Sequence, residues 1–325
     1  MQPLDLYRPA SREVSAHARD GLLAPGSILQ GYAIDSVIKD GSLSVVYKAY
    51  TPAGPVAIKE YFPKGLARRL PSGRISLTNP DNRPLFNSGL STFANEGEAL
   101  NSIRSDLLVQ RVELFRELDT AYLVTRFEDG ETLESFAKSH FRRHARIDED
   151  ELRFIFYTLL HGIHIMHQAG YVHLDLKPSN IIMRDANTPI LIDLGAARQI
   201  KDVSFKRNTS YVSNYTPGFA APEQYDSNAD RIGIHTDIYA VGANIYYCMS
   251  RRQPQPAIDR MNSDALIPAI RAFGAHYSNQ LLEIVDACMQ LEPAKRYQDV
   301  IKLQRILSEP APKKRPTAHR NEETT

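Results

Sequence analysis

Residues 171–196 constrain the fold of this chain more than any other stretch of the sequence. Asp175, Lys177 and Asn180 fall within one tight segment, and Asp193 follows a few residues later. Short apolar runs typical of strands follow Asn180 and precede Asp193, with a turn sequence between them, so we predict a hairpin that returns Asp193 beside Asn180. A carboxylate to orient a hydroxyl, together with amide and carboxylate oxygens to hold Mg²⁺, is what phosphoryl transfer requires.

Composition excludes several classes of protein. The chain has 325 residues, 42% hydrophobic and 24% charged, which is ordinary for a globular protein with a large core or two lobes. Its net charge of +1 supplies no bulk field that would attract polyanions. We therefore expect no nucleic-acid partner.

The cysteines and the hydropathy pattern indicate the cellular compartment in which the protein is expected. Cys248 and Cys288 lie in apolar helical patterns, which favour buried reduced thiols. No run of about 18 apolar residues occurs, and the N-terminus lacks a basic segment followed by an apolar core. We expect no membrane span, no conventional secretory signal and a cytoplasmic protein, although export by a non-classical route stays open.

The N-terminal part of the chain reads as strands. Residues 32–38 and 45–49 are strand-like, and the loop between them predicts a hairpin. Residues 55–59 alternate, so that Ala57 and Lys59 share one face of the next strand. Residues 107–115 and 121–127 indicate two more strands.

These segments together resemble the protein kinase superfamily. His173-Leu174-Asp175 stands in place of His-Arg-Asp, and Asp193-Leu194-Gly195 in place of Asp-Phe-Gly. Residues 216–223 end in Ala-Pro-Glu, and Arg296 stands where the family pairs an arginine with the glutamate of that motif, in this chain Glu223. The resemblance covers residues 32–307, nearly the whole chain.

The resemblance implies an α+β, bilobal protein-kinase-like fold. We expect a kinase domain over residues 25–307, with a small, mainly β N-lobe over 25–127 and a larger, mainly α C-lobe over 128–307. Residues 1–24 are predicted to be an irregular leader. Residues 308–325 are rich in proline and charge and are predicted to be a disordered tail.

The resemblance also assigns roles. Asp175 would be the base that accepts the substrate proton, Lys177 would steady the γ-phosphate, and Lys59 would neutralise the α- and β-phosphates. ATP with Mg²⁺, or Mn²⁺ as an alternative, is the implied cofactor, with Asn180 and Asp193 as metal ligands. The residues expected to bind it are Gly41, Val46, Ala57, Lys59, Glu96, Thr125, Phe127, Asn180, Ile182 and Asp193.

Two features depart from the family pattern. Of the three glycines of the phosphate-binding loop only Gly41 is present, because Lys39 and Ser44 occupy the other two positions. Residues 60–92 form an insert with several turn sequences, including one at Arg68-Arg69. The insert is expected to regulate, to dock a regulatory partner, or to be a plain loop. Glu98 competes with Glu96 as the partner of Lys59.

Residues 196–216 resemble an activation loop whose hydroxyls are candidate phosphorylation sites, and Asp237 begins an apolar helix that braces the catalytic loop in the family. Leu174 replaces the arginine that binds a phosphorylated loop, so we expect catalysis not to require loop phosphorylation.

His161, His164 and His167 share a helix, but no cysteine or carboxylate at ligand spacing supports a zinc site.

The predicted function is serine/threonine protein kinase, acting on protein hydroxyls. Lys177, two places after Asp175, follows the serine/threonine pattern, and the sequence is reminiscent of bacterial kinases of this type. One alternative is a pseudokinase scaffold, which the depleted glycine loop favours together with Leu174 and Leu194. Another is a kinase of small molecules, which the Ala-Pro-Glu segment disfavours.

Overall fold

The computed structural model describes residues 21–185, 187–200, 215–226 and 231–310. Within these ranges the chain divides into two compact units. The first contains residues 21–129 and 190–197, and the second contains the remainder. The expected division into an N-lobe over 25–127 and a C-lobe over 128–307 stays a prediction, and residues 190–197, expected in the C-lobe, group with the first unit.

Residues 190–197 join the first unit through its backbone. Val109 N–H donates to Leu191 O at 2.8 Å, and Leu191 N–H donates to Leu107 O at 3.0 Å. These bonds form an isolated parallel bridge between Leu191 and Leu108. The sequence predicts a strand over residues 107–115 that includes Leu108, but the observed strand begins only at Arg111. Asp193 therefore belongs to the unit that carries Lys59.

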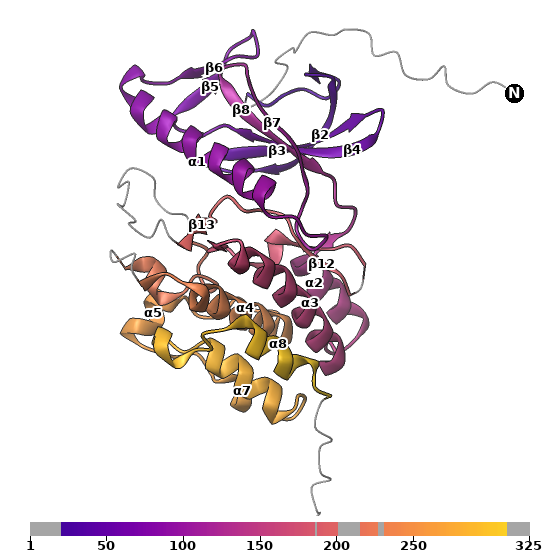
Figure 1. The fold of residues 1–325 in the computed structure, drawn as a ribbon, viewed down its shortest axis with the longest axis vertical. Helices are drawn as coiled ribbons and strands as arrows, with labels where there is room; N and C mark the ends of the chain where they lie inside the picture. Colours follow the sequence, from indigo (N-terminus) through magenta and orange to yellow (C-terminus); the bar gives the residue numbers. More distant parts are fainter. Residues whose placement is uncertain (1–20, 186, 201–214, 227–230, 311–325) are drawn as a thin grey trace, which may run out of the picture. The chain divides into compact units, whose positions relative to one another are not determined.

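The first unit is built on a six-stranded sheet (Figure 1). Strands neighbouring in the chain pair antiparallel, and β4 also pairs antiparallel with β8. In sheet order the strands are β1 (Ile28–Leu29), β2 (Tyr32–Asp40), β3 (Ser44–Thr51), β4 (Gly54–Tyr61), β8 (Thr120–Arg126) and β7 (Arg111–Glu117).

Side-chain alternation explains why β3 and β4 form. Val45, Tyr47 and Ala49 of β3 are buried on one face, while the residues between them are more exposed. On β4, Val56 and Ile58 are buried, and Ala57 and Lys59 share the opposite face, as predicted.

The insert is folded into the first unit. β5 (Ala67–Arg69) and β6 (Ile75–Leu77) form a hairpin, η1 (Pro80–Asn82) follows, and α1 (Arg83–Ser102) begins inside the predicted insert. The turn assigned to Arg68-Arg69 is wrong. Arg69 lies in a strand because its guanidinium is paired with the buried carboxylate of Glu60, which sequence spacing does not reveal.

The second unit is mainly helical. Two short strand pairs accompany the helices: β9 (Glu131–Thr132) with β11 (Ile181–Met183), and β10 (Tyr171–Val172) with β13 (Arg198–Gln199). Strand β12 (Pro189–Leu191) begins at the last residue of the segment 130–189 of this unit and continues into residues that group with the first unit. The short helical turns are η2 (Pro178–Asn180), η4 (Pro222–Tyr225) and η6 (Pro293–Lys295). The helices are α2 (Leu133–Arg143), α3 (Glu149–Gln168), α4 (Ile234–Ser250), α5 (Ala257–Asn262), α6 (Ala269–Phe273), α7 (Asn279–Cys288) and α8 (Val300–Ser308).

Helix α4 is the centre of the second unit. Every residue from Thr236 to Met249 is buried, which is expected of a helix packed on all sides. It packs against α3 and α7. Cys248 and Cys288 are buried and free, as predicted.

The two ends of the predicted domain need adjustment. Leu23 is buried and donates its N–H to Tyr47 Oη at 3.2 Å, so the end of the predicted leader packs on the sheet. Helix α8 extends through Ser308, which had been assigned to the tail. Residues 1–20 and 311–325 lie outside the described residues. None of the helices in the described part of the chain is long and apolar enough to span a membrane.

Candidate active site

Lys59 is the centre of a charged cluster in the first unit. Its Nζ donates to both carboxylate oxygens of Glu96, each at 2.8 Å, and to Asp193 Oδ1 at 2.9 Å. β4 supplies the lysine and α1 supplies the glutamate. The predicted Lys59–Glu96 pair is therefore confirmed. The competing residue Glu98 contacts Arg111 at 3.3 Å instead.

Burial and pairing set the charges of this cluster. Burial lowers the pKa of Lys59, but the carboxylates of Asp193 and Glu96 outweigh it and raise the pKa above its usual range. Burial likewise raises the pKa of Asp193, yet Lys59 and Lys39 hold it far below the usual range. Lys59 is thus a permanent cation and Asp193 a permanent anion at neutral pH.

Gly195 leaves room for this cluster. A Cβ at that position would come within 3.1 Å of both Asp193 Oδ1 and Lys59 Nζ. Its N–H donates to Asp193 Oδ1 at 3.0 Å, which fixes the carboxylate. Any larger residue at the glycine position of the Asp-Leu-Gly motif would therefore crowd the contact between Asp193 and Lys59.

Strand register places the residues predicted to bind the nucleotide within the first unit. Val46 is directly opposite Lys59, and Ala57 is directly opposite Thr125. Directly opposite residues point to the same face of a sheet, so these four side chains share the face that carries Lys59. Phe127 follows β8 and lies beneath Lys48, whose Nζ is 4.7 Å from the ring centroid.

A second group of predicted residues lies in the second unit. Asp175 Oδ2 accepts from Asn180 Nδ2 at 2.9 Å and pairs with Lys177 Nζ at 2.8 Å. Thr216 Oγ1 donates to Asp175 Oδ1 at 2.7 Å and accepts from Lys177 Nζ at 3.0 Å. Thus Asp175, Lys177 and Asn180 converge as predicted, and Thr216 adds a contact that the sequence did not indicate.

Asn180 carries the observation that bears on a metal. It is buried, its Nδ2 is committed to the backbone oxygen and carboxylate of Asp175, and its Oδ1 is a buried atom without a hydrogen-bond partner in the described part of the chain. An unpartnered amide oxygen beside a carboxylate suits a hard cation such as Mg²⁺. Asp193 belongs to the other unit, so its predicted return beside Asn180 stays a prediction. Ile182 is half-buried on β11.

Asp237 braces the catalytic loop, as predicted from the resemblance. It is buried at the first turn of α4, and it accepts hydrogen bonds from His173 N–H and Leu174 N–H, both at 2.9 Å. Asp237 Oδ2, which accepts from His173 N–H, also lies 2.7 Å from His167 Nε2. His167 is therefore bound to a carboxylate, while His161 on the same helix is exposed.

Glu223 and Arg296 form the predicted fork-to-carboxylate pair. Arg296 Nη1 and Nη2 donate to the two carboxylate oxygens at 2.6 and 2.9 Å, and both side chains are fully buried. The pair ties the Ala-Pro-Glu segment to the loop before α8. The candidate phosphorylation sites at Ser204, Thr209, Ser210, Tyr211 and Ser213 lie outside the described residues.

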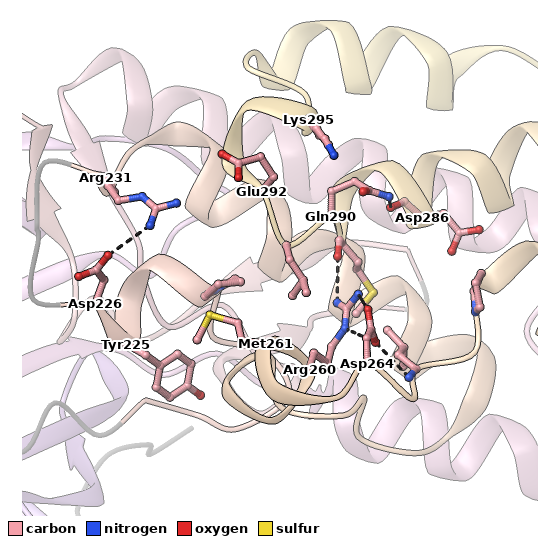
Figure 2. A pocket seen from close by; sticks show the side chains of 15 residues that line it. Tyr225, Asp226, Arg231, Arg260, Met261, Asp264, Asp286, Gln290, Glu292 and Lys295 are labelled. Carbon is pink, nitrogen blue, oxygen red and sulfur yellow. Dashed lines mark hydrogen bonds and ion pairs between the residues drawn. The ribbon is translucent and has the colours of Figure 1, made fainter.

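A separate cavity of about 780 Å³ occurs in the second unit (Figure 2). It is lined by η4, α5 and the segment after α7, and none of the predicted site residues lines it. Figure 2 shows two ion pairs within its wall, Arg231 with Asp226 and Arg260 with Asp264, and three further charged side chains, Asp286, Glu292 and Lys295. This cavity is therefore not part of the predicted site.

Comparison with known proteins decides the family. The protein kinase domain family matches residues 32–321. The chain belongs to the protein kinase family. A solved structure described as "PpkA-294 apo form" shares 31% sequence identity with this kinase at a TM-score of 0.76, covering 88% of this chain and 99% of the other.

Other relatives agree in type. Serine/threonine-protein kinase D of Synechocystis is 30% identical, over 54% of this kinase and 33% of its own length. Serine/threonine-protein kinase F of the same organism is 26% identical, over 70% of this kinase and 45% of its own length. The kinase thus spans less than half the length of these relatives. The Mycobacterium tuberculosis PknI kinase domain, at 17% identity and a TM-score of 0.62, shares the fold. The expected resemblance to bacterial serine/threonine kinases is confirmed.

Sequence reasoning missed three contacts around this site. They are the hydrogen bond from Thr216 to Asp175, the buried pairing of Arg69 with Glu60 beside Lys59, and the approach of Lys39 to Asp193. The first had a partial signal, since Thr216 precedes the Ala-Pro-Glu segment at a fixed position. The other two depend on strand register and have no motif.

Proposed function

We propose that this kinase is catalytically active and transfers the γ-phosphate of ATP to serine or threonine hydroxyls of proteins. The observation that carries the proposal is the cluster of Lys59, Glu96 and Asp193, in which the lysine is held by two carboxylates at hydrogen-bond distance. A half-buried lysine at this position is a fixed positive charge for phosphates, as phosphoryl transfer needs.

Asp175 orients the attacking hydroxyl and accepts its proton. The contact with Thr216 supports this role, because it demonstrates that Asp175 Oδ1 accepts a hydrogen bond from a threonine hydroxyl at 2.7 Å. Lys177, which contacts the same carboxylate, supplies a cation at the point where the γ-phosphate meets the hydroxyl.

Asn180 and Asp193 are the residues that would hold Mg²⁺. The ion, when bound, neutralises charge that develops on the phosphate oxygens. The buried, unpartnered Oδ1 of Asn180 and the permanently ionised carboxylate of Asp193 suit that ligand role. ATP is held on the sheet face that carries Val46, Ala57 and Thr125. Gly41, Phe127 and Ile182 are assigned to the nucleotide by the resemblance alone.

A protein is favoured over a small molecule as the substrate. The Ala-Pro-Glu segment is fixed by the buried pairing of Glu223 with Arg296, and the next residue, Gln224, donates to Leu174 O of the catalytic loop at 2.8 Å. Residues 60–92 remain a candidate docking segment for a regulatory partner, since Arg68 is exposed on the folded hairpin. The buried reduced cysteines suit a cytoplasmic setting.

The second candidate is a pseudokinase scaffold. It is favoured by the loss of two glycines from the phosphate loop and by Leu194 in the Asp-Leu-Gly motif. Leu194 is buried and removes no ligand, because Asp193 keeps its contacts with Lys59 and Gly195. The scaffold therefore explains fewer of the observed contacts.

Phosphate transfer from radiolabelled ATP–Mg²⁺ to generic protein substrates tests the proposal. We expect transfer by the wild type and a loss of about a hundredfold or more, about 2.7 kcal/mol of barrier, in Asp175→Ala and Asp193→Ala. Asp226→Asn, at an exposed ion pair with Arg231, is the matched control for carboxylate removal. Wild-type transfer in both site variants, with folding intact, would show that the assignment is wrong. A folded wild type that neither binds nucleotide nor transfers phosphate would establish the scaffold.

A further inference from the structure

Lys39 occupies the first glycine position of the phosphate loop, near the end of β2. The φ angle of Lys39 is not positive, so a residue with a side chain fits at this position without backbone strain. The substitution replaces a group that lets backbone approach phosphate with one that carries a cation on a long, flexible stem.

Strand register decides where this cation points. The pairing of β2 with β3 shifts between Val37 and Lys39, which sit opposite Tyr47 and Val46 respectively. The extra residue, Ile38, is a bulge, and bulges re-aim the side chains that follow them. Because Val46 is in turn opposite Lys59, the side chains of Lys39, Val46 and Lys59 lie in one row on one face of the sheet.

The distance agrees with the register. Lys39 Nζ lies 4.0 Å from Asp193 Oδ2, while Lys59 and Gly195 both donate to Asp193 Oδ1. Lys39 keeps 53% of its side chain exposed, and an exposed pair at this separation contributes little to stability. The lysine is therefore free to move from Asp193 to a stronger anion at little cost.

Backbone hydrogen bonds hold the loop in place. Gly41 N–H is already bonded to Ser44 O at 3.0 Å. The carbonyls of Ser42 and Leu43 accept from Lys64 N–H and Phe62 N–H at 2.8 and 3.0 Å, which holds the loop against the chain after β4. A loop that is pinned in this way and lacks two glycines cannot fold its backbone amides freely around phosphate.

We propose that Lys39 is a second phosphate-binding cation of this kinase, which contacts the β- or γ-phosphate of the nucleotide and replaces the lost glycine-loop contacts. The inference rests on the proposed function, because it takes ATP as the ligand of the face that carries Lys59. Lys59 alone faces two carboxylates, Glu96 and Asp193, and Lys39 balances them. Two cations on one face then receive a polyphosphate without an excess of negative protein charge.

Calorimetric titration of the full chain with adenosine, AMP, ADP and ATP, each with Mg²⁺, tests this role. We expect Lys39→Met to bind ATP and ADP about tenfold more weakly, a change of about 1.4 kcal/mol, with adenosine affinity unchanged. Lys39→Gly should lose as much, since it restores the family glycine but not the cation. Lys39→Arg should stay within about threefold of wild type.

Lys64→Met is the matched control. It removes the same charge near the same loop, but Lys64 Nζ is paired with Asp40 at 2.6 Å. We expect its ATP affinity to match wild type. Unchanged or tighter ATP binding by Lys39→Met, equal weakening for adenosine and ATP, or full affinity in Lys39→Gly would each overturn the inference. Failure of the wild type to bind any of the four ligands would instead overturn the proposed function on which it rests.

Discussion

Leu174 shows how a single residue departs from the family and is still held in place. Its φ is +65°, a left-handed conformation that costs a leucine about 1–2 kcal/mol. Its N–H donates to Asp237 Oδ1 at 2.9 Å, and its carbonyl accepts from Gln224 Nε2 at 2.8 Å. These bonds fix the backbone before Asp175 regardless of the side chain, so the family arginine is not needed for the shape of the loop.

The missing arginine predicts independence from loop phosphorylation. Replacing Ser204, Thr209, Ser210 and Ser213 together with alanine should leave transfer to an exogenous substrate within about tenfold of wild type, because Leu174 offers no cation to a loop phosphate. The measurement is radiolabel transfer by a variant confirmed to be folded. A hundredfold fall, about 2.7 kcal/mol of barrier, reversed by one phosphorylated hydroxyl, would mean that Lys201, Lys206 or Arg207 replaces the arginine.

Asp237→Asn should lower the free energy of unfolding by about 2–4 kcal/mol, because one amide oxygen cannot accept from His173 N–H, Leu174 N–H and the His167 ring together. Denaturant unfolding measures the loss. Asp226→Asn, at an exposed pair, should change it by less than about 1 kcal/mol. Equal effects in the two variants would contradict the bracing role.

The same carboxylate predicts a pH dependence. Burial raises the pKa of Asp237, but its hydrogen bond with His167 and its other contacts hold the pKa below the usual range. A depressed folded-state pKa stabilises the protein above the unfolded value of about 3.9, and this contribution is lost as pH falls through the folded value. The stability gap between wild type and Asp237→Asn should therefore narrow below about pH 4.

At the scale of elements, the hairpin β5–β6 is locked to the sheet by Arg69. Its Nη2 contacts both oxygens of Glu60 at 2.6 and 2.5 Å, and its Nε donates to Gly21 O at 2.6 Å. Glu60 also accepts from the hydroxyls of Tyr47 and Tyr122. A hairpin, a strand and the end of the leader thus share one buried ion pair.

Arg69→Met should cost about 3–5 kcal/mol of stability, because it leaves a buried carboxylate without its cation. Adding Glu60→Gln should recover part of the loss, since glutamine still accepts from the tyrosine hydroxyls without a charge. Chemical unfolding of the single and double variants measures the coupling. Arg74→Met, in the same hairpin but at an exposed pair with Asp119, should cost less than about 1 kcal/mol. Additive losses from Arg69→Met and Glu60→Gln would contradict the coupling.

Helices α4 and α7 meet at Gly242. A Cβ there would lie 2.6 Å from Cys288 Cβ, which has no freedom to move away. Gly242→Ala should therefore destabilise the fold by about 1–3 kcal/mol through overpacking, despite a higher helix propensity. Gly97→Ala is the control, since its Cβ would meet only the flexible tip of Leu114 at 3.0 Å and its effect should be within about 1 kcal/mol of zero. Thermal unfolding compares the two, and a smaller loss at Gly242 would disprove the contact.

At the scale of the whole molecule, nucleotide binding should appear as stability. A ligand at a hundred times its dissociation constant stabilises the folded state by about 2.7 kcal/mol. ATP with Mg²⁺ should raise the unfolding temperature by several degrees, and ATP with a chelator should raise it less. Asp193→Asn should lose most of the metal-dependent part, whereas Asp226→Asn should keep it. Equal shifts with and without the metal in wild type would contradict the assignment of Asn180 and Asp193.

Local sequence determined the strands, the helices and the catalytic segment, because their signals are short in range. Alternation on β4 places Ala57 and Lys59 on one face, and the spacing of Asp175, Lys177 and Asn180 brings them together within a single turn. The family motifs then placed Glu96, Glu223, Asp237 and Arg296, whose contacts are all present.

Tertiary structure alone decided the contacts that join distant segments without a motif. The bulge at Ile38 turns Lys39 toward Asp193, Arg69 crosses from the insert to Glu60, and residues 190–197 attach to the backbone around Leu108. Register, burial and pairing across a sheet depend on which strands become neighbours, and a one-residue shift reverses the face of a side chain. Composition and spacing along the chain do not contain that information.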